Sequence, residues 1–134
     1  MKYLFNTLLI LLLSNTIHAS VGNMQSEDVA KSIESSVVVI DIRTPAEWKQ
    51  TGTIKKAHRI MFFDPKGKPL VEEFMKEFKK IVTKKNQAVI LVCRSGNRTG
   101  MVSKYLDQQL GYSNVSHLAK GMKQWLRENR PVDK

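Results

Sequence analysis

The chain has 134 residues, of which 22 are Lys or Arg and 12 are Asp or Glu, giving a formal net charge of +10 at pH 7. This length is enough for one domain with one core, and the single cysteine excludes an internal disulfide. The basic charge favours anionic partners, and the dispersed lysines are typical of a solvated basic surface.

The first 19 residues have the pattern of a cleavable secretory signal. Lys2 supplies the positive start, residues 4–13 form a short apolar run, and Ala19 ends a small-residue exit. The run is too short to span a bilayer comfortably, and an uncleaved N-terminal anchor is the alternative. We therefore expect a signal peptide over 1–19 and one periplasmic or secreted domain over 20–134, without stable membrane insertion. An exported chain seldom meets nucleic acid, so no nucleic-acid partner is expected.

The first half of the expected mature chain alternates helix and strand signals. After a short polar leader over 20–25, Ser26 can cap a helix whose first turn is acidic. A β-branched run over 37–40 predicts a strand. A capping box over 44–47, with proline at the first helical position, predicts a short helix that ends near Gly52.

The second half continues the same alternation. A short apolar run over 88–92 predicts a buried parallel strand. The other elements predicted here are strands over 57–63 and 115–118 and helices over 70–82, 99–110 and from Gly121 onward. Because strands alternate with helices throughout, we expect an α/β fold with a central parallel sheet covered by helices on both faces.

Ligands of such sheets bind beyond the carboxyl ends of the strands. Asp41-Ile42-Arg43 is expected at the end of one predicted strand, and Cys93-Arg94 follows another. The charged and reactive side chains of both segments are therefore expected at the same edge of the sheet.

Cys93 lies between the strand over 88–92 and the N-terminus of the next helix. Backbone N–H groups and the helix dipole favour an anion there, so the sulfur is favoured as a nucleophilic thiolate. Gly96 allows the backbone to curl around a small anion, and Arg94 and Arg98 bring positive charge. The alternative is a buried structural cysteine, which would not need two arginines and a glycine directly after it.

Three segments form an ordered set of motifs. The first is Asp41-Ile42-Arg43 with Glu47-Trp48, the second is the loop over 93–98, and the third is the segment over 118–125. In this order they resemble the motifs of a single-domain rhodanese, a sulfurtransferase that carries sulfur as a cysteine persulfide. Three positions depart from the pattern, which often has histidine at the first and glycine at the other two: Thr53, Lys56 and Lys120.

The resemblance implies a three-layer rhodanese-like fold, no metal or organic cofactor, and sulfur transfer in two half-reactions. Cys93 would be the catalytic residue, taking sulfur from a small anionic donor such as thiosulfate and passing it to cyanide, a thiol or a protein acceptor. The implied substrate-binding residues are Arg94, Ser95, Gly96, Asn97 and Arg98. The implied loop-supporting residues are Asp41, Arg43 and Glu47.

The resemblance also suggests how individual side chains act. Arg98 is expected to brace the loop through Asp41 or Glu47, while Glu47 can equally serve only its capping box. Arg43 is expected at the pocket rim or in solvent. The histidines at 58 and 117 are too few for a metal site and are expected to be packed or on the surface. Core anchoring is expected of the two tryptophans, Trp48 and Trp125.

Two other functions remain open at this stage. A non-catalytic persulfide carrier or binding module would use the same thiol to hand sulfur to one protein partner. A cysteine phosphatase or arsenate reductase would also hold an anion in such a loop. That class needs one residue more between cysteine and arginine than the four that separate Cys93 from Arg98.

Overall fold

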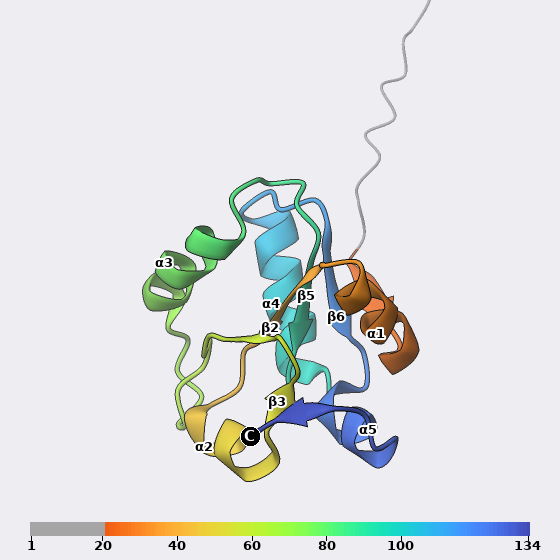
Figure 1. Cartoon of the computed structure of the whole chain (residues 1–134). Helices are drawn as coiled ribbons and strands as arrows, with labels where there is room; N and C mark the ends of the chain where they lie inside the picture. The colour runs from red at the N-terminus through yellow and green to blue at the C-terminus, as the bar shows by residue number, and fades with distance from the viewer. Residues whose placement is uncertain (1–20) are drawn as a thin grey trace, which may run out of the picture.

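A computed structural model of the chain describes residues 21–134, which form a parallel five-stranded sheet with helices on both faces (Figure 1). The order across the sheet is β1-β6-β5-β2-β4, and every neighbouring pair is parallel. Its strands are β1 (Gly22–Met24), β2 (Val38–Asp41), β4 (His58–Arg59), β5 (Val89–Val92) and β6 (Val115–Leu118). A second, antiparallel sheet pairs β3 (Thr53–Ile54) with β7 (Val132–Asp133). The predicted α/β class is confirmed.

Five helices connect these strands within the described residues. They are α1 (Ser26–Glu34), α2 (Pro45–Thr51), α3 (Val71–Ile81), α4 (Asn97–Gln108) and α5 (Gly121–Arg127). No helix among residues 21–134 is long and apolar enough to cross a membrane. The predicted signal peptide over 1–19 lies outside the described residues.

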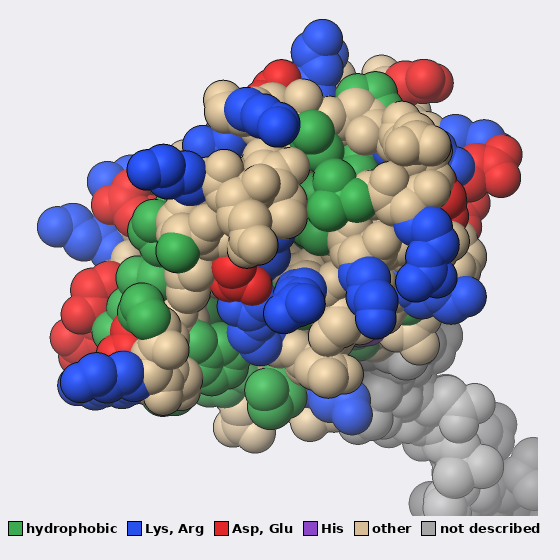
Figure 2. All heavy atoms as spheres, turned by 90° about the horizontal axis from the view of Figure 1, so that it is seen from below, with side chains coloured by type: hydrophobic (Ala, Val, Ile, Leu, Met, Phe, Trp, Pro, Cys, Tyr) green, Lys and Arg blue, Asp and Glu red, His purple; other side chains and the backbone are tan. Residues whose placement is uncertain are grey.

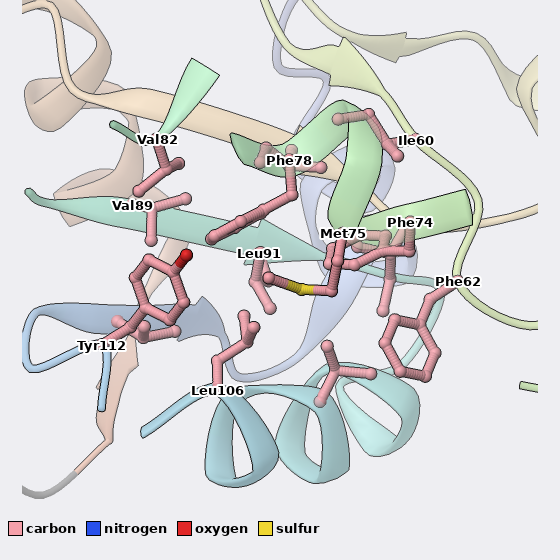
Figure 3. Packing of buried hydrophobic residues seen from close by; sticks show 14 of the residues in the cluster. Ile60, Phe62, Phe74, Met75, Phe78, Val82, Val89, Leu91, Leu106 and Tyr112 are labelled. Carbon is pink, nitrogen blue, oxygen red and sulfur yellow. The ribbon is translucent and has the colours of Figure 1, made fainter. Parts of the chain in front are cut away.

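Alternate residues of the central strands feed two separate cores. Ile40 and Leu91 point to one face of the sheet, where they pack with side chains of α3 and α4. Figure 3 shows this cluster, in which aromatic rings of α3 lie over the sheet and Leu106 reaches up from α4. Phe62, Phe74 and Phe78 form a chain of ring contacts with centroids 4.9 and 5.5 Å apart. Such pairs add stability beyond the buried area alone.

The opposite face of the sheet is covered by α1 and α5. Val39 and Ile90 point to this side and pack with Val29 of α1 and with Met122 and Trp125 of α5. Trp125 is buried, as expected, and its ring N–H donates to the Pro131 carbonyl. The central strands β2 and β5 are thus buried on both faces, which is why their apolar residues follow one another and do not alternate with polar residues.

The structure differs from the sequence expectations at several element boundaries. The polar leader contains β1, which is held by parallel pairing to β6. Ser26 is the first residue of α1 rather than its cap, and no side chain caps that helix. The strand expected over 57–63 is reduced to His58–Arg59, and α4 begins two residues earlier than expected, at Asn97. Trp48 is only partly buried and belongs to neither core.

Candidate active site

Cys93 directly follows β5 at the carboxyl edge of the sheet and is 1% exposed. The backbone N–H of Gly96 donates to its Sγ at 3.2 Å. Gly96 has φ of +92°, and a Cβ built there would lie 2.0 Å from the Ala119 carbonyl oxygen. Only glycine therefore permits this turn, which brings the N–H onto the sulfur.

The carbonyl groups of the loop are held from the C-terminal motif. Met122 N–H donates to the Cys93 carbonyl at 2.8 Å, and Lys123 N–H donates to the Arg94 carbonyl at 2.9 Å. Gly121 has φ of +63°, and a Cβ there would lie 2.3 Å from the Arg94 carbonyl oxygen. The start of α5 thus orients the loop carbonyls away from the sulfur.

Arg98 braces the loop against α2 through Glu47. Its two terminal nitrogens donate to the two Glu47 carboxylate oxygens at 2.9 and 2.6 Å. The same carboxylate completes the capping box, accepting hydrogen bonds from the Thr44 N–H and hydroxyl, each at 3.0 Å. Both readings of Glu47 therefore hold at once, and of the two expected partners Arg98 contacts Glu47 rather than Asp41.

The pKa of Glu47 reflects this arrangement. Partial burial alone would raise it, but the hydrogen bonds from Arg98 and Thr44, together with the Arg98 charge, lower the pKa to about 2. The hydrogen bond to Glu47 correspondingly raises the pKa of Arg98. The pair is charged across the physiological range and ties the loop to α2 by a bidentate contact.

Arg43 is buried, which corrects the expectation that it could face solvent, but it does line a hollow together with Glu47 and Arg94. It is 1% exposed and pairs with Asp41, which is fully buried, at 2.8 Å. Its remaining donors reach Thr51 Oγ1 at 2.9 Å and the Gly52 carbonyl at 2.8 Å. Thr53 also donates its hydroxyl to Asp41. This network joins the end of β2 to the end of α2, so it supports the active loop only indirectly.

Arg94, Ser95 and Asn97 are exposed at the mouth of the loop. Arg94 lines two hollows that flank the loop: one of about 290 Å³ beside α5, and one of about 570 Å³ toward Phe63 and Met101. Cys93 itself lines neither hollow. Access to Cys93 is therefore limited in this conformation, because its side chain is almost fully buried.

Three polar residues that the sequence analysis did not assign to the site lie on the other side of the thiol, and one of them, His117, is packed, which is one of the two positions expected for it. Thr99 Oγ1 is 3.4 Å from Cys93 Sγ and 2.8 Å from His117 Nδ1. His117 Nε2 is 2.7 Å from Asn23 Oδ1. Thr99 follows the loop directly and could have been suspected from its position. Asn23 gives no such signal, because it reaches His117 only through the pairing of β1 with β6.

The arrangement of possible metal ligands can be stated for the described residues. Within 21–134, no three His, Cys, Asp or Glu side chains gather closely enough to hold a metal ion. His58 is exposed on β4, whereas His117 is buried.

Comparison with known proteins agrees with this arrangement. The profile of the rhodanese-like domain matches residues 25–128, which span the loop, its braces and the C-terminal motif. The chain belongs to the rhodanese family. A curated relative, a sulfurtransferase of Allochromatium vinosum, is 32% identical over 114 residues, covering 84% of this chain and 94% of that protein.

Solved rhodanese structures share the fold. The rhodanese-related protein of Thermoplasma volcanium has a TM-score of 0.63 at 23% identity, covering 84% of this chain and 97% of that one. The polysulfide-sulfur transferase of Wolinella succinogenes has a TM-score of 0.65 at 20% identity, covering 87% and 80%. These similarities confirm the three-layer rhodanese fold predicted from the sequence.

Proposed function

We propose that this rhodanese moves sulfane sulfur from a donor such as thiosulfate to a thiophilic acceptor through a persulfide on Cys93. The observation that carries the proposal is a lone thiol that follows a parallel strand and accepts a backbone N–H inside a loop braced from two sides. The sulfurtransferase name of the Allochromatium vinosum relative supports the same reaction class.

The first half-reaction forms the persulfide. The Cys93 thiolate attacks the outer sulfur of thiosulfate, a sulfur–sulfur bond forms, and the bond to the sulfite group breaks so that sulfite leaves with its electron pair. Arg94 at the loop mouth attracts the anionic donor and the departing sulfite.

The second half-reaction regenerates the thiolate. Cyanide or a thiolate attacks the outer sulfur of the persulfide, and Cys93 leaves with the electron pair of the broken bond. Gly96 N–H holds the inner sulfur. The other backbone N–H groups of the loop, up to Arg98, are then available to stabilise the negative charge on the outer sulfur.

Mass spectrometry with and without thiosulfate tests this proposal. We expect the protein to gain one sulfur, about 32 mass units, and to lose it on addition of cyanide or a reducing thiol. Cys93→Ser should abolish both the adduct and turnover, and a variant that retains full activity would refute the mechanism.

Small-molecule turnover separates the alternatives. A persulfide adduct without turnover of cyanide or small thiols would indicate a carrier dedicated to one protein partner. Hydrolysis of an aryl phosphate without sulfur transfer would indicate a phosphatase.

We also propose that residues 1–19 are removed and that the domain over 20–134 works outside the cytoplasm. The charged start, apolar run and Ala19 exit support this. Mass measurement of the N-terminus in cell fractions tests it, and an intact Met1 on a soluble cytoplasmic protein would overturn it.

A further inference from the structure

Cys93 is the first member of a chain of hydrogen bonds that leads to the edge strand of the sheet. Sγ contacts Thr99 Oγ1 at 3.4 Å, Thr99 Oγ1 contacts His117 Nδ1 at 2.8 Å, and His117 Nε2 contacts Asn23 Oδ1 at 2.7 Å. The four residues come from the loop after β5 and from α4, β6 and β1. Nothing in the persulfide chemistry itself requires the last two.

The direction of the hydrogen bonds follows from donor and acceptor chemistry. Asn23 Oδ1 can only accept, so His117 Nε2 carries a hydrogen and Nδ1 offers a lone pair. The Thr99 hydroxyl then donates to Nδ1 at 2.8 Å, in preference to the Gly96 carbonyl at 3.2 Å. Its oxygen retains a lone pair that can accept the Cys93 S–H.

We propose that His117 is a positioning residue that takes up the Cys93 thiol proton through Thr99, with Asn23 fixing its ring. The S–H proton passes to the Thr99 oxygen as the hydroxyl proton passes to His117 Nδ1. The products are a thiolate, an intact hydroxyl and an imidazolium, so no atom is gained or lost. The proton returns by the same path when the thiolate is protonated again.

The surroundings of His117 keep its ring neutral until a negative charge forms beside it. The ring is 7% exposed, and burial lowers its pKa, so it is neutral at pH 7 and the Nδ1 lone pair is free to accept the Thr99 hydroxyl. Because the same burial disfavours the imidazolium, His117 holds the proton only against the negative charge of the Cys93 thiolate. Its neighbours on each side are uncharged: Asn23 on β1, Leu91 on β5, and Thr99 and Gly100 on α4. The titratable group that it faces is therefore Cys93, through Thr99.

Alkylation of the single cysteine by iodoacetamide, followed against pH in the full chain, tests the chain of contacts. We expect His117→Gln and Thr99→Val to slow alkylation at pH 7 about ten-fold and to move its pH midpoint up by about one unit. Thr99→Ser keeps the hydroxyl and should restore the wild-type profile. His58→Asn, which changes an exposed histidine on β4, is the matched control and should change nothing.

Asn23→Asp should shift the pH midpoint of alkylation in the opposite direction. Asn23 is exposed on an edge strand, so a carboxylate there is tolerated and would increase the proton affinity of the ring. We expect the midpoint to move to lower pH, a change that a purely structural role would not produce. This variant and the Thr99 pair decide the matter even if His117→Gln fails to fold.

A His117→Gln profile that coincides with the wild type, or an upward shift in Asn23→Asp, would overturn the inference. The role of this proton relay from Cys93 through Thr99 to His117 rests on the proposed sulfur transfer. Alkylation tests the relay separately, because it needs no sulfur donor. A protein with the expected profiles and no sulfurtransferase activity would therefore refute the proposed function and leave the relay intact.

Discussion

At the residue scale, the structure contains two Arg–carboxylate pairs with different tasks. Arg98–Glu47 is partly exposed and holds the reactive loop, whereas Arg43–Asp41 is fully buried and holds α2 to β2. Breaking a buried pair leaves an uncompensated charge in the interior, while breaking an exposed pair costs much less.

Arg43→Met should therefore be among the most destabilising single changes. It leaves the Asp41 carboxylate buried with only part of its hydrogen bonding, for which we expect a loss of about 3–5 kcal/mol in the free energy of unfolding. Urea unfolding measures it, with Arg127→Met on the exposed side of α5 as the control. A loss equal to that of the control would contradict the described network.

The Glu47 pair predicts a pH dependence of stability. The folded-state pKa of about 2 lies below the ordinary 4.5, so the unfolded chain binds this proton more readily. The stabilisation is therefore present above about pH 4.5 and is lost as the pH falls towards 2. We expect wild type to exceed Glu47→Gln by about 1–2 kcal/mol at pH 7, after allowance for partial exposure. A difference that stays constant down to pH 2 would argue against the assignment.

At the element scale, the start of α5 is part of the active site although it carries none of the reacting atoms. Gly121 packs its backbone against the Arg94 carbonyl, and the two following N–H groups bind the loop carbonyls.

Gly121→Ala should deform the reactive loop. Besides its positive φ, the new Cβ would lie 2.3 Å from the Arg94 carbonyl oxygen, so the loop or the helix has to shift. We expect sulfur transfer to fall at least ten-fold, roughly the effect of misplacing a reacting group. Gly111→Ala is the matched control, because it has a similar φ of +74° with nothing within 4 Å of the new Cβ. Equal activity in the two variants would show that loop shape does not depend on this contact.

The central strands, most helices and the position of Cys93 could be predicted because they rest on local signals. The apolar run before the loop and the capping box after β2 act within a few residues. The burial of Arg43 could not be predicted, because its guanidinium donates to Thr51 Oγ1 and to the Gly52 carbonyl. These acceptors lie eight and nine positions further along the chain and are brought beside Arg43 by α2. β1 and β7 were missed because each is short, polar and stabilised by a distant partner strand. Lys56 has a φ of +70°, a left-handed conformation that favours glycine, so the glycine expected there from the resemblance suits this backbone better than lysine does.

At the scale of the whole molecule, the excess of basic residues surrounds the reactive edge as well as the rest of the surface. Figure 2 shows Lys and Arg side chains spread over the end of the molecule that includes α2 and α5, with apolar side chains among them. Lys123 and Arg94 line the hollow beside α5. This charge attracts a small anion before it reaches the loop.

The rate of reaction with thiosulfate should consequently depend on salt. Raising the ionic strength from about 0.01 to 0.15 M shortens the screening length from about 30 to 8 Å. We expect kcat/KM for thiosulfate to fall a few-fold over this range, while kcat/KM for a neutral donor stays nearly constant. Parallel decreases for both donors would mean that salt acts on the protein and not on the approach of the anion.

The contacts of Gly96 with Ala119 and of Gly121 with Arg94 join segments that are more than twenty positions apart along the chain. Residues 93–98 therefore lack their reactive shape in any folding intermediate in which residues 118–123 have not yet docked. A partly folded copy would carry an ordinary thiol that binds no N–H group and is not shielded. The shape of the reactive loop is thus a tertiary property, which residues 93–98 acquire only together with residues 118–123.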